Sequence, residues 1–154
     1  MDISAKGIAL IKGFEGLRLV AYQDIAGVWT MGYGSTRYAD GRKVKKGDKL
    51  VNEACANDLL LATLKNFVAD VNRLIKVPLT QSQFDALVSW HYNTNGLNAK
   101  TCTLRTMLNA KNYQGAADQL DAWNKVTDPE TKLKKVSDTL TKRRAKEKKL
   151  FLTQ

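Results

Sequence analysis

The stretch "GFEGLRLVAYQDIAGVWTMGYGST", residues 13–36, interrupts a chain whose other segments follow a helical pattern. Its glycines break helical periodicity, and two runs within it, at 17–22 and 28–33, are typical of β-strands. The two runs predict a β-hairpin that is closed by the three-residue loop at 25–27.

This register places polar side chains together on one face of the hairpin. Asp24 lies opposite Val28 and diagonal to Thr30, so Asp24 and Thr30 point the same way, roughly 7–8 Å apart. The alternate residues face the other way, and we expect them to pack the small sheet: Trp29, Met31 and Tyr33.

Helical segments are expected on both sides of the hairpin, and most have recognisable ends. Ser4 caps the first helix, and Asn52 caps a long helix that stops before Pro78. Thr80 and Gln83 form a capping box for the next helix, which ends at an Asn-Gly pair. After the first helix, the expected helical segments are residues 53–76, 82–92, 101–110, 114–125 and 138–152.

These elements predict an α+β fold that is mostly α. With 154 residues, 44% of them hydrophobic, the chain suits one compact domain over residues 1–154. We expect a β-containing lobe at about 13–50 and a connecting helix at about 52–76. The N-terminal helix joins residues 80–154 in a helical lobe.

The formal charge of +10 indicates a polyanionic partner, either nucleic acid, an anionic envelope or a cell wall. The apolar residues near the N-terminus form no run long enough for a signal peptide or a membrane span. We therefore expect synthesis in the cytoplasm, no stable membrane insertion, and release by another factor for work outside it.

The sequence offers no cofactor or metal motif. Cys55 and Cys102 lack metal-ligand spacing, and His91 alone cannot complete a zinc site with them. We expect both cysteines to be reduced and buried, and His91 to have a packing or surface role at a helix end. The "GYG" run at 32–34 has Arg37 where a dinucleotide loop needs its third glycine.

Glu15 continues the apolar stripe of the first helix, after Ile8 and Ile11. A carboxylate facing inward is costly unless it is paired, whereas a carboxyl that keeps its proton suits a general acid. The structural alternative is that Glu15 pairs with Arg143 or Arg144, which does not exclude a catalytic role.

Asp24 and Thr30 also allow both a catalytic and a structural interpretation. A carboxylate and a hydroxyl on one hairpin face are suited to accept a proton from a water molecule and to orient it. Equally, Asp caps turns and Thr favours strands.

The chain resembles the bacteriophage-type lysozymes, endolysins of glycoside hydrolase family 24. The matching residues are "FEGLRLVAYQD" and "GVWTMGYGST", followed by "LTQSQFDALVSW", "TLRTMLNAKNYQGAADQLDAWNK" and "KRRAKEKKLF". The resemblance implies a lysozyme-like fold with the active-site cleft between two lobes. It also implies cleavage of the β-1,4 bond between N-acetylmuramic acid and N-acetylglucosamine in peptidoglycan. By position, Glu15 becomes the general acid, Asp24 the water-activating carboxylate and Thr30 its partner.

Two departures from the family pattern stand out. Ser35 replaces the usual His after "GYG", so a structural tie made by that His is absent or replaced. The family's "FN-x-G" becomes "HYNTNG" with altered spacing. We still expect Tyr92 and Asn93, with Thr103, to face sugar, because an aromatic face and amide donors suit saccharide recognition. The structural alternative for these residues is a helix-end cap and core contact.

Two other functions compete with hydrolysis. A nucleic-acid-binding module would use a terminal basic cluster, together with Lys132, Lys134 and Lys135. We interpret the cluster instead as the solvated face of a terminal helix beside Leu140, Leu150 and Phe151. Its members are Lys142, Arg143, Arg144, Lys146, Lys148 and Lys149. An inactive lysozyme-fold protein would only bind glycan. We expect a monomeric enzyme that acts on the anionic wall and its periplasmic side, without nucleic acid, cofactor or metal.

Overall fold

The computed structural model describes all 154 residues and divides the chain into two compact units. Unit 1 comprises Met1–Ile8 and Phe67–Gln154, and unit 2 comprises Ala9–Asn66. Helices α1 (Ala5–Glu15) and α2 (Glu53–Leu74) contribute residues to both units. None of the helices is both long and apolar enough to span a membrane.

Unit 2 is built on the expected hairpin, β1 (Arg18–Gln23) and β2 (Trp29–Gly32). Its antiparallel register pairs Tyr22 with Thr30 and Gln23 with Trp29, with a shift toward Arg18. The alternate face packs as predicted, since Met31 forms a core with Val44 and Leu59. Partly buried apolar side chains surround that core: Ala21, Trp29, Tyr38 and Leu50.

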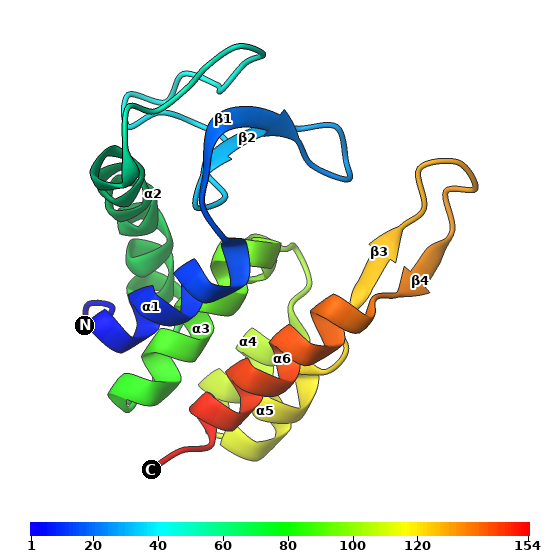
Figure 1. Cartoon of the computed structure of the whole chain (residues 1–154). Coiled ribbons are helices and arrows are strands. Elements are labelled where there is room, and N and C mark those ends of the chain that lie inside the picture. Colours follow the sequence, from blue (N-terminus) through cyan, green and yellow to red (C-terminus); the bar gives the residue numbers. More distant parts are fainter. The chain divides into compact units, whose positions relative to one another are not determined.

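Unit 1 is organised around α3 (Gln81–Thr94), whose residues from Phe84 to His91 are all buried. A helix buried on every side needs neighbours all round, and α6 (Asp138–Phe151) runs beside it (Figure 1). The remaining helices are the 3₁₀ turn η1 (Gly96–Asn98), α4 (Thr103–Asn109) and α5 (Tyr113–Leu120), and α5 packs on α4 and α6.

The predicted helix ends are largely confirmed. The Thr80–Gln83 capping box is present, and Asn95 ends α3 in the left-handed conformation. The Asn52 side chain accepts the N–H of Cys55, and the Ser4 hydroxyl accepts that of Gly7. Local bonds of this kind depend on residues three apart, so the sequence specifies them.

The first turn of α1 is also tied to α3. The Ser4 N–H donates to Asp85 Oδ1 at 3.0 Å, and its hydroxyl donates to Asp85 Oδ2. Gly7 packs so closely that an added Cβ would lie 2.7 Å from the Asp85 carboxyl carbon. The buried carboxylate of Asp85 is thereby satisfied from a segment remote in sequence.

Three expectations need correction. Helix α2 ends at Leu74, two residues early, because the Asn109 side chain binds the Leu74 carbonyl and the Lys76 N–H. The predicted helix at 114–125 ends at Leu120, and Cys55 is only half-buried because it lies in the exposed first turn of α2.

A second hairpin was not predicted. Strands β3 (Lys125–Thr127) and β4 (Lys134–Val136) pair antiparallel and project from the helices of unit 1 (Figure 1). Its strands are short and rich in lysine, so neither shows the apolar alternation of a half-buried strand.

Candidate functional site

Glu15 is the last residue of α1 and is half-buried. The backbone of Gly34, at φ +82°, lies against its carboxylate, because a Cβ built there would be 2.6 Å from Glu15 Oε2. Only glycine permits this approach at a positive φ. The turn after β2 therefore lies against the carboxylate and leaves no room there for a side chain at residue 34.

Asp24 closes the β1–β2 hairpin. Its N–H donates to the Val28 carbonyl at 2.9 Å, so the predicted three-residue loop is confirmed. Asp24 Oδ1 accepts the N–H groups of Ala26 and Val28, each at 2.9 Å. The prediction that Asp24 caps the turn is therefore confirmed, through Oδ1. No hydrogen bond within the chain engages Oδ2.

Thr30 lies on the same hairpin face as Asp24, as its pairing with Tyr22 requires. Its side chain is buried, at 4% exposure, and the hydroxyl donates to the Val28 carbonyl at 2.9 Å. Since its proton is committed to that carbonyl, Oγ1 presents lone pairs and acts as an acceptor toward any water beside it.

Ser35 follows this turn and is fully buried. Its N–H and carbonyl both bond to Met31, at 2.9 Å each, whereas its Oγ has no hydrogen-bond partner in the chain. The backbone, and not the side chain, therefore holds the position where the resembling family has His.

The three predicted sugar contacts belong to unit 1. Tyr92 is half-buried on α3, with its ring edge-on to Phe67 at a centroid distance of 5.3 Å. Asn93 is exposed, and its Oδ1 accepts a 2.7 Å hydrogen bond from Arg144 Nη2. Thr103 is the exposed first residue of α4.

The bond to Arg144 fixes the amide of Asn93. Because the guanidinium binds the oxygen, the NH₂ group is the end of the amide that points away from Arg144, and it has two N–H donors for a ligand. Asn93 is thus suited to a carbonyl or hydroxyl oxygen.

Arg143 and Arg144 are buried on α6, at 6% and 0% exposure, so the solvated-face reading is wrong for both. Their partner is the fully buried Glu147, three and four residues on, which Arg144 meets at 2.9 Å and Arg143 at 3.1 Å. The Ser89 hydroxyl donates to the same carboxylate at 2.7 Å. Burial raises the pKa of Glu147, and the two guanidiniums oppose that shift.

Sequence reasoning missed Glu147. An acid three and four residues after two arginines on a helix was the available signal. The flanking lysines concealed it, because a dense basic run is usually solvated. Leu150 and Phe151 are buried as predicted.

His91 is fully buried, which excludes the surface role. Its Nε2 lies 2.8 Å from Asp70 Oδ2, and its Nδ1 accepts the Leu97 N–H at 3.3 Å. That acceptor requires a neutral ring with its proton on Nε2. Burial lowers the pKa of His91, although Asp70 opposes the shift. No group of three or more metal-ligating side chains occurs in the structure.

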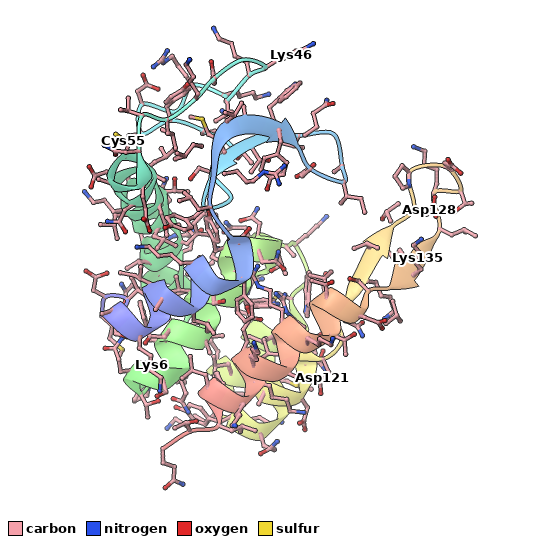
Figure 2. All side chains as sticks on the ribbon, in the orientation of Figure 1. Lys6, Lys46, Cys55, Asp121, Asp128 and Lys135 are labelled. Atoms are coloured by element: carbon pink, nitrogen blue, oxygen red, sulfur yellow. The ribbon has the colours of Figure 1, made fainter.

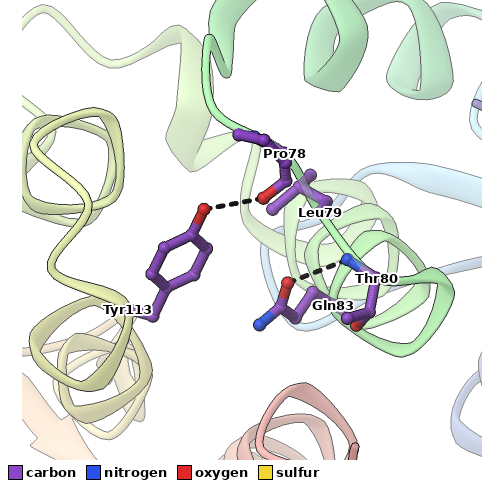
Figure 3. A pocket seen from close by; sticks show the side chains of 5 residues that line it. All are labelled: Pro78, Leu79, Thr80, Gln83 and Tyr113. Atoms are coloured by element: carbon purple, nitrogen blue, oxygen red, sulfur yellow. Dashed lines mark hydrogen bonds between the residues drawn. The ribbon is translucent and has the colours of Figure 1, made fainter.

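A cavity of 340 Å³ lies where the α2–α3 connection meets α5 (Figure 3). Its polar groups hold the backbone: the Tyr113 hydroxyl donates to the Pro78 carbonyl at 2.7 Å, and Gln83 accepts the Thr80 N–H at 2.9 Å. None of the candidate residues lines it, so we assign it a structural role.

A family model described as phage lysozyme matches residues 12–147. An endolysin of Bacillus phage B103 is 45% identical over 99% of the chain, which spans 55% of that protein. An endolysin of Acyrthosiphon pisum secondary endosymbiont phage 1 is 42% identical over 98% of both chains. The solved endolysin from Escherichia coli O157:H7 phage FAHEc1 superposes with a TM-score of 0.87 at 44% identity, covering 99% of this chain and 94% of its own.

Proposed function

The chain belongs to the phage lysozyme family of glycoside hydrolases, and we propose that it cleaves the β-1,4 bond between N-acetylmuramic acid and N-acetylglucosamine in peptidoglycan. The observation that carries this proposal is the hairpin face of unit 2, where Asp24 and Thr30 present acceptors side by side. Glu15, held against Gly34 in the same unit, supplies the acid.

We propose that Glu15 acts as the general acid and Asp24 as the general base. Glu15 donates its proton to the glycosidic oxygen as the bond from that oxygen to the anomeric carbon breaks. A water molecule attacks the anomeric carbon and gives its proton to Asp24. The oxygen that leaves the sugar thus ends as a hydroxyl, and charge and protons balance.

The hydrogen bonds within the hairpin suit this role for water. The loop amides hold Asp24 Oδ1 in place, so Oδ2 is the atom available to accept the proton. Thr30 Oγ1, with its own proton on the Val28 carbonyl, accepts the second O–H of the water. A water held by two acceptors turns a lone pair away from both, toward the sugar.

We also propose that sugar is bound by Tyr92, Asn93 and Thr103. An aromatic ring, an outward amide and a hydroxyl are groups that recognise saccharides. The charge of +10 favours an anionic wall as the place of action. We propose that the enzyme is a monomer made in the host cytoplasm, and that it lyses the host once released to the wall.

The test of Glu15 is its replacement by an isosteric amide. Glu15→Gln should fold normally and lower the rate of lysis of outer-membrane-stripped cells by about 10²–10⁴-fold, because an amide cannot donate the proton. Glu130→Gln, at an exposed acid, is the matched control. Hydrolysis at the native rate by folded Glu15→Gln would exclude the assignment, and glycan binding without cleavage by the native chain would favour the inactive alternative.

Asp24 allows a sharper separation of structure from chemistry. In Asp24→Asn the amide oxygen can still accept both loop N–H groups, so the hairpin should persist while the proton acceptor is lost. Asp24→Ala removes both functions. We expect Asp24→Asn to keep native stability and lose activity, and an active Asp24→Asn would show that the residue is only a turn cap.

The proposed water also predicts the stereochemistry. Attack by water inverts the anomeric carbon, and inverting enzymes separate their carboxyls by about 6.5–9.5 Å. Proton NMR of the fresh reducing end should show the α-anomer first. A β-configured first product would contradict the role given to Asp24 and Thr30.

A further inference from the structure

The β3–β4 hairpin has a defined tip although it lies in solvent. A ribbon with three residues per strand is marginal by itself. Asp128 organises its turn, since Oδ1 accepts the N–H groups of Glu130 at 2.9 Å and Thr131 at 3.2 Å. Oδ2 pairs with Lys135 at 3.3 Å, and Figure 2 labels this pair on the hairpin. The hairpin therefore projects into solvent with a turn that is held by its own hydrogen bonds and ion pair.

Aliphatic side chains are exposed on this projection next to lysines. Leu133 is 69% exposed beside the tip, and Val136 is 59% exposed at the end of β4. The register places Lys125 directly opposite Val136, and Lys134 lies on that same face. Since Asp128 already pairs with Lys135, the cations left for a partner are Lys125, Lys132 and Lys134.

The chemistry of the hairpin selects among anionic partners. Residues 125–136 contain no aromatic residue and no arginine. Proteins that bind bases or sugars stack them on aromatic rings. Sequence-specific contacts to base edges and bidentate hydrogen bonds to phosphate usually come from arginine. Lysines interleaved with exposed aliphatic groups instead suit the boundary between anionic headgroups and acyl chains.

We propose that the β3–β4 hairpin is a peripheral contact for an anionic phospholipid surface. Lys125, Lys132 and Lys134 attract the headgroups, and Val136, on the face that Lys125 and Lys134 share, enters the boundary beneath them. Each lysine near such a surface strengthens binding roughly fivefold, so the contact is weak, reversible and sensitive to salt. It does not depend on the hydrolytic activity.

The test is co-sedimentation of the full chain with phosphatidylcholine vesicles that contain phosphatidylglycerol, or contain none. Native protein should bind only the anionic vesicles, and less so at high salt. Lys132→Gln with Lys134→Gln should weaken binding by about 25-fold. Val136→Ser should weaken it by about tenfold, because the aliphatic group no longer leaves water, whereas Leu133→Ser, on the opposite face, should weaken it far less.

A matched control removes the same charge elsewhere on unit 1. Lys142→Gln with Lys149→Gln changes two exposed lysines of α6 and should weaken binding far less. All variants alter exposed side chains, and thermal unfolding checks that each is folded. Equal losses in both lysine pairs would show that only net charge matters and would overturn the proposal. So would hairpin variants that bind vesicles normally but lose binding to purified peptidoglycan or to duplex DNA.

Discussion

Gly34→Ala should disable the enzyme by displacing Glu15, although it replaces none of the proposed catalytic residues. A Cβ at Gly34 would lie 2.6 Å from Glu15 Oε2 and 2.9 Å from its carboxyl carbon. Ordinary van der Waals contact begins at 3.4 Å, so the carboxylate must withdraw by about 0.8 Å, and a displacement near 1 Å can cost about 10²-fold in rate.

The substitution also has a backbone cost that must be separated from this effect. Gly34 has φ +82°, where an L-residue loses about 1–2 kcal/mol. Gly47 supplies the control, because its φ is +88° and nothing lies within 4 Å of an added Cβ. Gly47→Ala should therefore show the loss of stability without the loss of rate.

The assay combines urea unfolding of both variants with rates of wall hydrolysis, normalised to folded protein. We expect Gly47→Ala to hydrolyse at nearly the native rate and Gly34→Ala to fall about 10²-fold below it. If both variants are equally active per folded molecule, then contact with Gly34 does not position the acid, and the geometric argument for Glu15 is wrong.

Three further predictions concern other groups. Asn93→Asp should leave stability unchanged, because a carboxylate still accepts the hydrogen bond from Arg144. It should raise KM about tenfold with little change in kcat, since the outward N–H donors are lost. An unchanged KM would show that Asn93 has only a structural role. Ser35→Ala should raise the free energy of unfolding in urea by about 1 kcal/mol, because a buried hydroxyl without a partner is removed, whereas a loss of stability would reveal a bound water. Because burial lowers the pKa of His91, the unfolded chain takes up the proton first as pH falls below about 6.5, so stability should decline from there toward pH 5. In His91→Gln that decline should be shallower, and an unchanged slope would assign it to other groups, among them Asp70.

Features set by near neighbours in the chain were predictable from the sequence. The capping box at Thr80 and Gln83 and the Asp24 loop depend on hydrogen bonds between residues two to four apart. The hairpin face shared by Asp24 and Thr30 follows from the two-residue period of strands and the loop length.

Features set by distant partners were not predictable. The end of α2 at Leu74 depends on Asn109, and the burial of Arg144 depends on packing of α6 against α3. A carboxylate such as Glu147 also looks the same in sequence whether it is solvated or buried. The spacing of Glu147 from the two arginines indicates that they pair, but its burial emerges only once Ser89 is brought beside it.

The membership of residues 1–8 in unit 1 has a consequence for biosynthesis. A ribosome makes the chain from its N-terminus, so Ser4 is complete long before its partner Asp85, which lies 81 positions later. Throughout that interval the first turn of α1 lacks the carboxylate that it binds in the finished molecule. Unit 2, in contrast, is one uninterrupted segment, Ala9–Asn66. Closing a loop as long as that from Ser4 to Asp85 is entropically unfavourable and slow, so the docking of the first turn of α1 onto α3 should be a late step in folding.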